Sequence, residues 1–398
     1  MNGPNISPSI YPASKDPGSF YDFVIAGAGA AGLSLLVRMI KSGNFTQKRI
    51  LLIDKAPKTA NDRTWCFWEK GPGLFEEVVF KSWPAISFYG QDFTGQFDIH
   101  PYRYKMIRGI DFYEYCFSLI ETQNNITVRY GNVSQLQNHP GSASLLLDEK
   151  RITAGYIFSS IISEKPVLNN KQFYLLQHFK GWVIKTSQPR FNIEEATLMD
   201  FRVNQQNGTT FVYVMPFSPD TALVEYTLFS KNLLQPHEYD AGLDDYIRSF
   251  LMCKDYEVTS EETGVIPMTN YRFPSHKGNI IHIGTAGGET KPSSGYTFQF
   301  IQKRTAAIVR QLAKNGGIAS MPASSRKFRF YDSVLLNVLA TGKLPGDIIF
   351  THLFRKNSSQ RIFSFLDNES NLLQDLKLIS SLPTLPFLKA ASEQGMSF

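Results

Sequence analysis

The first pattern that could do chemistry is a glycine-rich run, which consists of Gly27, Ala28, Gly29, Ala30, Ala31 and Gly32. Its three glycines have the spacing of a turn that holds a pyrophosphate. The first makes the turn tight, the second admits the ligand to the backbone, and the third lets a helix pack on its strand. Asp54 ends the next apolar run, where a carboxylate would bind the ribose hydroxyls of an adenosine. We therefore expect a bound dinucleotide; the alternative is a structural βαβ unit with a glycine-rich turn.

Glu225 is the second candidate for chemistry. The runs 209–217 and 222–230 are rich in β-branched and aromatic residues and flank a Ser-Pro-Asp-Thr turn, so they predict a hairpin. Apart from Asp220 in the turn, Glu225 is its only charged residue. Both alternating faces are apolar, which predicts a sheet covered on both sides, and a carboxyl buried there has a raised pKa and can act as an acid. The alternative is an edge-strand carboxylate that reaches solvent or pairs with an arginine.

Two further segments carry residues of interest. Trp65 and Trp68 lie in an aromatic block with charged edges, residues 61–69. They either line a ligand cavity near the cofactor or anchor the segment to a core. Glu261 and Glu262 precede an apolar segment and could supply a second carboxylate to a cavity, although adjacent acids in a connection between elements are more often solvated.

The elements that must position these residues begin with a βαβ unit, in which residues 21–26 and 49–53 are expected to be strands and residues 33–42 a helix. A later apolar strand over 279–283 is followed by a glycine-containing turn over 284–295 and a helix over 299–315. A strand end aimed at a helix N-terminus suits a phosphate or other polar groups of a cofactor. Residues 244–253 predict another helix.

Composition restricts the function classes. With 398 residues, 42% of them hydrophobic, the chain can fill about two domains. Its three cysteines are far apart and its seven histidines lack ligand spacing, so we expect neither disulfides nor a metal. No run of about eighteen apolar residues predicts a membrane span. The net charge of +6 fits nucleic acid, an anionic membrane surface or an ordinary solvated face.

The ends of the chain bear on its location. Residues 1–19 are rich in Pro, Ser and Asn and lack the apolar core of a signal peptide, so we expect a disordered lead-in and a cytoplasmic protein. Basic residues lie beside apolar ones between Arg326 and Phe354, which indicates a surface that rests on lipid; a helical cap over the substrate domain is the alternative. We expect peripheral association with the cytoplasmic membrane and no nucleic-acid partner.

Five motifs in sequence order resemble those of the bacterial flavin-dependent lycopene β-cyclases. They are the glycine-rich run and the segments RTWCFWE (63–69), LVEYT (223–227), GVIPM (264–268) and GTAGGETKPSSGY (284–296). The resemblance covers about residues 21–300 and extends in character to the C-terminal helices. Two departures stand out: Tyr226 occupies a position where family members often carry a second acid, and Thr285 one where the wider fold often has an aspartate.

The resemblance implies a redox-neutral isomerisation in which the ψ-end groups of a linear carotene, lycopene, close to β-ionone rings and give γ-carotene and β-carotene. It implies FAD in the reduced form and NAD(P)H as the reductant. A proton adds to the terminal alkene, the neighbouring double bond attacks the cation, and a proton is lost. Glu225 matches the family's catalytic glutamate, and aromatic side chains would stabilise the cation. The alternative is a FAD-dependent oxidoreductase of the same fold, an aromatic hydroxylase or a polyprenyl reductase.

These expectations assign residues to a site. The expected cofactor contacts are the glycine-rich run and Asp54, Lys55, Arg63, Val133, Gly284, Thr285, Ala286, Gly295 and Tyr296. The expected substrate contacts are Trp65, Trp68 and Tyr226.

The expected fold is α/β: a Rossmann-type FAD-binding domain, an inserted mixed β-sheet substrate domain and a C-terminal helical region. The FAD-binding domain is expected to comprise residues 20–85, 109–165 and 276–320. The substrate domain is expected to comprise residues 86–108 and 166–275, and the helical region residues 321–398.

Overall fold

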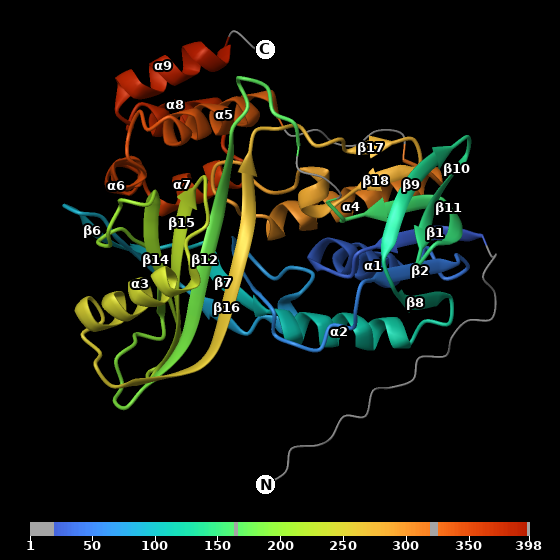
Figure 1. Ribbon diagram of the computed structural model, residues 1–398, viewed down its shortest axis with the longest axis horizontal. Coiled ribbons are helices and arrows are strands. Elements are labelled where there is room, and N and C mark those ends of the chain that lie inside the picture. The colour runs from blue at the N-terminus through green and yellow to red at the C-terminus, as the bar shows by residue number, and fades with distance from the viewer. Residues whose placement is uncertain (1–19, 163–165, 319–324, 396–398) are drawn as a thin grey trace.

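The computed structural model of the protein describes residues 20–162, 166–318 and 325–395, so the predicted lead-in over residues 1–19 lies outside the described residues. Figure 1 shows one sheet at the right of the view and a second at the left, with the C-terminal helices, drawn in orange and red, at the upper left.

The first sheet is built on parallel strands. Its described strands are β1 (Tyr21–Ala26), β2 (Ile50–Asp54), β8 (Ile126–Tyr130), β9 (Val133–His139), β10 (Ser142–Leu147), β11 (Lys150–Ser159), β17 (His276–Lys277) and β18 (Ile280–His282). The main order is β17-β18-β11-β1-β2-β8, and β9 and β10 attach through β11. β1 pairs in parallel with both β2 and β11, as in a nucleotide-binding βαβ unit.

Both faces of the first sheet are covered. On one face lie α1 (Ala30–Ser42), α2 (Gly109–Glu121) and α4 (Phe298–Asn315), and they bury Ile25, Leu52 and Phe158 in a common core. On the other face Leu145 of β10 packs with Val24 and Leu51. The apolar runs of β1 and β2 are therefore continuous rather than alternating because side chains on both faces are buried.

The second sheet is long and mixed. Its described strands are β5 (Ala85–Tyr89), β6 (Thr94–Asp98), β12 (Tyr174–Thr186), β13 (Glu195–Asp200), β14 (Thr209–Ser218), β15 (Thr221–Ser230) and β16 (Tyr256–Thr269). Their order is β16-β12-β15-β14-β13-β5-β6, and only the β13–β5 pair among these is parallel. β14 and β15 form the predicted hairpin at the centre of this sheet.

The two faces of the second sheet meet different partners. α3 (Pro236–Ser249) packs on one face against Val212, Val214 and Val224. The opposite face packs against a three-stranded sheet of β3 (Thr64–Glu69), β7 (Arg103–Arg108) and β4 (Lys81–Trp83), and against α5 (Arg326–Ala340), α6 (Gly346–Lys356) and α7 (Ser359–Leu366). A polar residue in the middle of β15 is therefore shielded on whichever face it lies.

The remaining elements are α8 (Leu372–Ile379), α9 (Thr384–Gly395) and the short 3₁₀ turns η1 (Glu76–Val78) and η2 (Gly284–Gly287). Within the described ranges, no helix combines the length and apolar character needed to cross a membrane. The apolar residues expected on lipid between Arg326 and Phe354 are largely buried, including Leu336, Phe350 and Phe354, so α5 and α6 form the helical cap that the sequence also allowed.

The α/β fold class predicted from the sequence is confirmed, with its parallel nucleotide-binding sheet, mixed second sheet and C-terminal helices. Two local predictions are wrong. The helix expected over 244–253 is α3, which begins at Pro236 because Gln235 and Glu238 form a capping box and proline is favourable in the first turn. Glu261 and Glu262 lie within the long strand β16 and not in a connection.

Candidate active site

Glu225 lies in the middle of β15 on the face that packs against β3, β7 and the C-terminal helices. Its neighbours along the strand, Leu223 and Phe229, belong to the core on that face. In the sheet it pairs with Tyr213 of β14 on one side and Gly181 of β12 on the other. Directly paired residues project to the same face, so these three positions define a row across the sheet.

The row continues to a second carboxyl group. Gly181 also pairs with Glu262 of β16, so the glycine lies between the two glutamates. A Cβ built on Gly181 would lie 3.2 Å from Glu262 Cγ and 3.6 Å from Glu225 Cβ. The missing side chain thus leaves the space in which the two glutamate side chains approach each other, close enough for the charge of Glu262 to act on Glu225.

Threonine hydroxyl groups hold both carboxyl groups. Thr227 Oγ1 donates to Glu225 Oε1 at 2.8 Å, and Thr64 Oγ1 of β3 donates to Glu262 Oε2 at 2.7 Å. Glu225 is 8% exposed, whereas Glu262 is only partly buried. The second sheet and the three-stranded sheet therefore contribute one hydroxyl group each, and these fix the orientation of the two carboxyl groups.

The surroundings disfavour ionisation of Glu225. Burial, followed by the nearby Glu262 charge, raises the pKa of Glu225 to about 8. Burial also raises the pKa of Glu262, while the hydrogen bond from Thr64 and the charge of Arg63 act in the lowering direction. Glu225 is therefore the member of the pair that holds a proton near neutral pH.

The side chains around Glu225 include sulfur-containing groups and aromatic rings. Cys66 of β3 contacts Met215 of β14, with 3.3 Å between the sulfur atoms. The side chains of Tyr104, Tyr213 and Tyr296 lie in the same cluster, and burial raises the pKa of each phenol. These groups stay neutral and present electron-rich surfaces, which suits a cation without a counter-ion in contact.

Alternation along β3 separates the two tryptophans. Trp65 packs on Phe112 in the core of the first sheet, with ring centroids 5.0 Å apart, which matches the core-anchor alternative. Trp68 faces the other way and stacks on Phe363 of α7, with ring centroids 4.5 Å apart. The ring of Tyr296 meets Trp68 edge-on, with centroids 4.4 Å apart. Only Trp68 lies beside the Glu225 cluster, together with Thr64 and Cys66 of the same face.

Tyr226 does not lie with Glu225. It is on the α3 face of the sheet, in the core formed by Val224 and Leu243, and a Cβ on Gly242 of α3 would lie 2.8 Å from its ring. The expectation of a substrate contact is corrected because successive residues of a strand project to opposite faces.

The glycine-rich run has the geometry of a dinucleotide turn. Gly27 has φ +107°, and a Cβ there would lie 2.0 Å from Ser160 Oγ. A Cβ on Gly32 would lie 1.9 Å from the Gly27 carbonyl oxygen, so the glycine permits the helix to approach the turn. Gly29, by contrast, has no heavy atom within 4 Å of such a Cβ, which leaves room for a ligand beside the N-terminus of α1.

The predicted ribose-binding carboxylate lies at the same turn. Asp54 Oδ2 accepts a hydrogen bond from Ala28 N at 2.6 Å, and Lys58 Nζ lies 3.2 Å from Asp54 Oδ1. The Asp54 carbonyl accepts from Gly131 N at 2.9 Å, which brings the chain just before Val133 to this strand end. Lys55 is exposed after β2.

Arg63 precedes β3, and its guanidinium contacts Asp62 at 3.0 Å. It adjoins the carboxyl pair through Thr64, and its charge acts on Glu262; the charge of Asp54 at the glycine-rich turn also acts on Arg63.

The loop between β18 and α4 connects the glycine-rich turn to the second sheet. A Cβ on Gly284 would lie 3.0 Å from Ala31 Cβ, so η2, with Thr285 and Ala286, abuts the start of α1. Gly295 packs against Gln177 of β12, which projects to the same face as Gly181. The loop therefore runs from the expected phosphate site to the Glu225 cluster, where Tyr296 lies.

A buried lysine ties this loop to the C-terminal helices. Lys291 is 2% exposed, and its Nζ lies 2.9 Å from Asp332 Oδ1 of α5 and 2.8 Å from Asn368 Oδ1. Ser293 Oγ donates to the same Asp332 oxygen at 2.6 Å. Neither contact was expected from the sequence.

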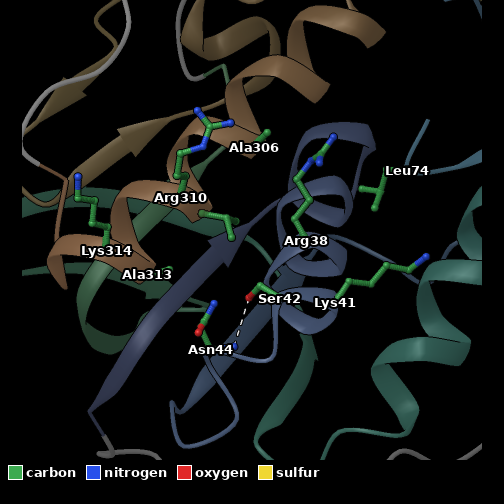
Figure 2. Close-up of a pocket in the computed structure, with 10 residues that line it drawn as sticks. Arg38, Lys41, Ser42, Asn44, Leu74, Ala306, Arg310, Ala313 and Lys314 are labelled. Carbon is green, nitrogen blue, oxygen red and sulfur yellow. Dashed lines mark hydrogen bonds between the residues drawn. The ribbon is translucent and has the colours of Figure 1, made fainter. Parts of the chain in front are cut away.

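A surface pocket of about 590 Å³ lies elsewhere, between α1 and α4 (Figure 2). The cationic side chains of Arg38, Lys41, Arg310 and Lys314 surround it. Lys41 and Lys314 lie in the last turns of their helices, where cations offset the helix dipole. The pocket includes none of the expected site residues, and the Glu225 cluster is the candidate active site on chemical grounds.

Sequence reasoning missed Thr64, Cys66, Gly181 and Tyr213, and it named Glu262 only together with Glu261 as a possible second carboxylate. The alternation of β3 could have placed Thr64 and Cys66 on one face with Trp68. Glu262 required the pairing register of β12 with β16, which is a long-range property.

Comparison with known proteins gives a consistent family. A family model described as "Lycopene cyclase protein" matches residues 22–392. A lycopene beta-cyclase of Paracoccus sp. (strain N81106 / MBIC 01143) is 23% identical over 385 residues, which cover 92% of this chain and 95% of that protein. A lycopene beta-cyclase of Pantoea ananas is 26% identical over 262 residues, 63% of each chain. A chloroplastic neoxanthin synthase of Solanum lycopersicum is 25% identical and covers 69% of this chain.

The chain spans 57% to 64% of the length of three of its curated relatives. Among solved structures, the flavin-dependent brominase Bmp2 superposes with a TM-score of 0.63 at 13% identity and covers 96% of this chain and 100% of its own. A geranylgeranyl bacteriochlorophyll reductase-like protein from Thermoplasma acidophilum superposes with a TM-score of 0.56 at 12% identity, covering 95% and 97%. At these identities the likeness shows the fold alone.

We expect the folding stability of the protein to fall between about pH 5 and pH 8 by more than that of a Glu225→Gln variant. The pKa of Glu225 is about 8 in the folded protein against an ordinary 4.5, so the folded state binds more protons in this range and loses stability as pH rises. Glutamine cannot ionise, while the other buried acids with raised pKa values, Glu289 and Asp367, remain in both proteins. Urea unfolding at both pH values measures the difference, and equal losses would show that Glu225 titrates normally.

Proposed function

The chain belongs to the lycopene cyclase family, and we propose that it is a lycopene β-cyclase, which closes the ψ-end groups of a linear carotene to β-ionone rings. The proposal rests chiefly on Glu225, a protonated carboxyl group with a pKa raised to about 8 that lies among buried tyrosine side chains. The reaction converts lycopene to γ-carotene and β-carotene as isomers of unchanged mass.

The side chains suit each step of this isomerisation. Glu225 gives its proton to the terminal alkene, whose π electrons form the new C–H bond and leave a tertiary cation. The neighbouring double bond attacks the cation and forms the ring, and loss of a ring proton restores a neutral product. Tyr213, Tyr296 and Trp68 face the cation with electron-rich rings, while burial excludes the water that would trap it.

The glycine-rich turn fits FAD, which belongs to the proposal together with NAD(P)H as its reductant. The open space at Gly29, the N-terminus of α1 and Asp54 suit the pyrophosphate and ribose, and the backbone of the 284–286 segment adjoins them. The reduced flavin would supply an electron-rich ring system beside the substrate. The loop through Tyr296 connects this cofactor site to Glu225.

Membrane association also remains a proposal, because an apolar carotene must be taken from lipid. The most exposed apolar side chains of the C-terminal region lie on α8 and α9, beyond the segment that the sequence suggested, where Ile348 is 38% exposed; they are Leu372, Leu373, Leu376, Leu385 and Leu388, at 60% to 80% exposed. Lys377 and Lys389 are exposed on the same helices and would add roughly 1 kcal/mol each on an anionic surface.

Glu225→Gln should lose β-ring formation by about a hundred- to ten-thousand-fold, because the amide keeps the shape of the side chain but has no acidic proton. The assay is chromatography of carotenoids from cells that accumulate lycopene, with Glu257→Gln, an exposed acid on β16, as the control. A ring-closed product of unchanged mass supports the cyclase. Near-normal β-carotene from Glu225→Gln with full flavin content would contradict the role, and a product of changed mass would contradict the reaction.

Gly29→Val should abolish flavin binding, since its side chain fills the space beside the N-terminus of α1 without touching the protein. Gly71→Val is the matched control, because Gly71 also has no heavy atom within 4 Å of a built Cβ and no positive φ. Absorbance of the purified proteins measures bound flavin. Stoichiometric flavin in Gly29→Val would remove the turn from the cofactor site.

The double variant Leu373→Ser/Leu385→Ser should bind liposomes about tenfold more weakly or worse, since each leucine buried in lipid contributes about 1.5 kcal/mol or more. Val167→Ser/Leu233→Ser is the control, because these residues are 92% and 52% exposed but lie outside α8 and α9. Flotation with anionic vesicles at low salt gives the bound fraction. Equal binding by both double variants would exclude the α8 and α9 leucines as the contact.

A further inference from the structure

Glu262 is a partly buried titratable group to which the proposed reaction assigns no role. It lies across Gly181 from Glu225, on the same face of the sheet, and the charge of Glu262 acts on Glu225 across this glycine. Its neighbour Glu261 behaves as a surface acid: its side chain is 53% exposed and lies 3.0 Å from Lys180 Nζ. Two adjacent acids in one strand therefore have opposite environments.

We propose that Glu225 and Glu262 form a carboxylic acid–carboxylate pair that shares one proton, in which Glu225 delivers the proton to the substrate and Glu262 carries the negative charge. This inference rests on the proposed function for the identity of the proton acceptor. The departure at Tyr226 is then without consequence for a paired-carboxylate site, because the second acid comes from β16 and not from the neighbouring position in β15.

The environments of the two groups decide which one holds the proton. Glu225 is the more buried, so ionisation is less favourable there. Glu262 accepts a hydrogen bond from Thr64 at 2.7 Å and feels the positive charge of Arg63, and both favour its carboxylate form. Glu225 Oε1 accepts the hydrogen bond from Thr227, so Oε2 is the oxygen that carries the proton.

The glycine at 181 is the structural requirement for the pair. Glu225 and Glu262 belong to strands that are not adjacent, because β12 lies between them. A Cβ at 181 would lie 2.9 Å from Leu223 Cδ1 and 3.2 Å from Glu262 Cγ, so any side chain there would push the glutamates apart. Carboxyl groups held together in this way titrate as a pair.

The protons and charges of the proposed reaction balance within the substrate and the carboxyl pair. The Glu225 O–H bond breaks as the C–H bond forms on the terminal alkene carbon, so the substrate gains one positive charge and the pair one negative charge. The alkene electrons of the neighbouring double bond form the ring C–C bond. The proton that then leaves the ring returns to the pair, which thereby loses the extra negative charge and again holds one proton and one negative charge, so no oxidant or reductant is consumed.

Other ionisable groups facing the pair do not compete for this proton. Cys66 of β3, Tyr213 of β14, and Tyr104 and Tyr296 from the opposite side have pKa values raised by burial and remain neutral. The charged neighbours are Arg63 and Asp62 before β3, which act on Glu262 in opposite directions. The pH response of the site near neutrality therefore belongs to the two glutamates.

The test compares Glu262→Gln, Glu262→Asp and the matched control Glu261→Gln in the full-length flavin-bound protein. Infrared spectra of the protein without carotene report the Glu225 carboxyl band, which is assigned by its loss in Glu225→Gln. The pH at which half of this band is lost is the titration midpoint of Glu225. Removing the Glu262 charge should lower this midpoint by about one pH unit or more, and the basic limb of the pH–rate profile for ring formation should shift by the same amount. Glu262→Asp keeps the charge and should retain part of the high midpoint, and Glu261→Gln should match the unsubstituted protein.

An unchanged Glu225 midpoint in a folded Glu262→Gln protein would overturn the pair, whatever the activity. A rate that falls equally at all pH values, with the limb in place, would also overturn it, because this is the result of a merely structural role. If the midpoint shifts but the unsubstituted protein forms no β-ring, the proposed function fails, and with it the transfer of the proton to a carotene. The infrared result thus separates failure of the pair from failure of the function.

Discussion

Burial of two carboxyl groups against each other is the constraint on which the rest of the second sheet depends. Moving an ion out of water costs on the order of several kcal/mol, and two like charges in contact would cost more, so such a pair is tolerated only with one proton and a full set of hydrogen bonds. Thr227 and Thr64 supply those bonds from two different sheets. β3 must therefore pack on β15 and β16 for the site to exist, and the C-terminal helices must exclude water from the same face.

The local parts of the site were accessible from the sequence. Glu225 could be identified because it is the only charge in the two strands of an apolar hairpin, and the structure confirms the burial that this pattern predicts. The glycine-rich run could be identified because strand, turn, helix and acid follow one another within a short stretch of chain. Both depend on neighbours in sequence.

The predictions that failed depend on which strands pair and on which face of a strand points toward the site. Glu262 could not be separated from Glu261 as a candidate second carboxylate, since adjacent acids are more often solvated and nothing nearby in sequence identifies Gly181 as the neighbour of Glu262. Trp65 and Tyr226 were expected near the substrate, although each lies one residue away from a side chain that does face the site, Cys66 and Glu225. A shift of one residue in a strand inverts the face, which is why residue type alone could not separate them.

The buried contact of Lys291 with Asp332 and Asn368 has a consequence for the order in which the protein can mature on the ribosome. The lysine lies in the loop that joins the nucleotide turn to Tyr296, yet its partners are 41 and 77 positions later in the chain. A buried ammonium without its carboxylate is unfavourable by about 3 kcal/mol or more, so this loop cannot adopt its final path while α5 is still inside the exit tunnel. The catalytic end of the loop is therefore completed only after synthesis of the C-terminal helices, which delays the formation of a reactive acid site until the whole enclosure can close around it.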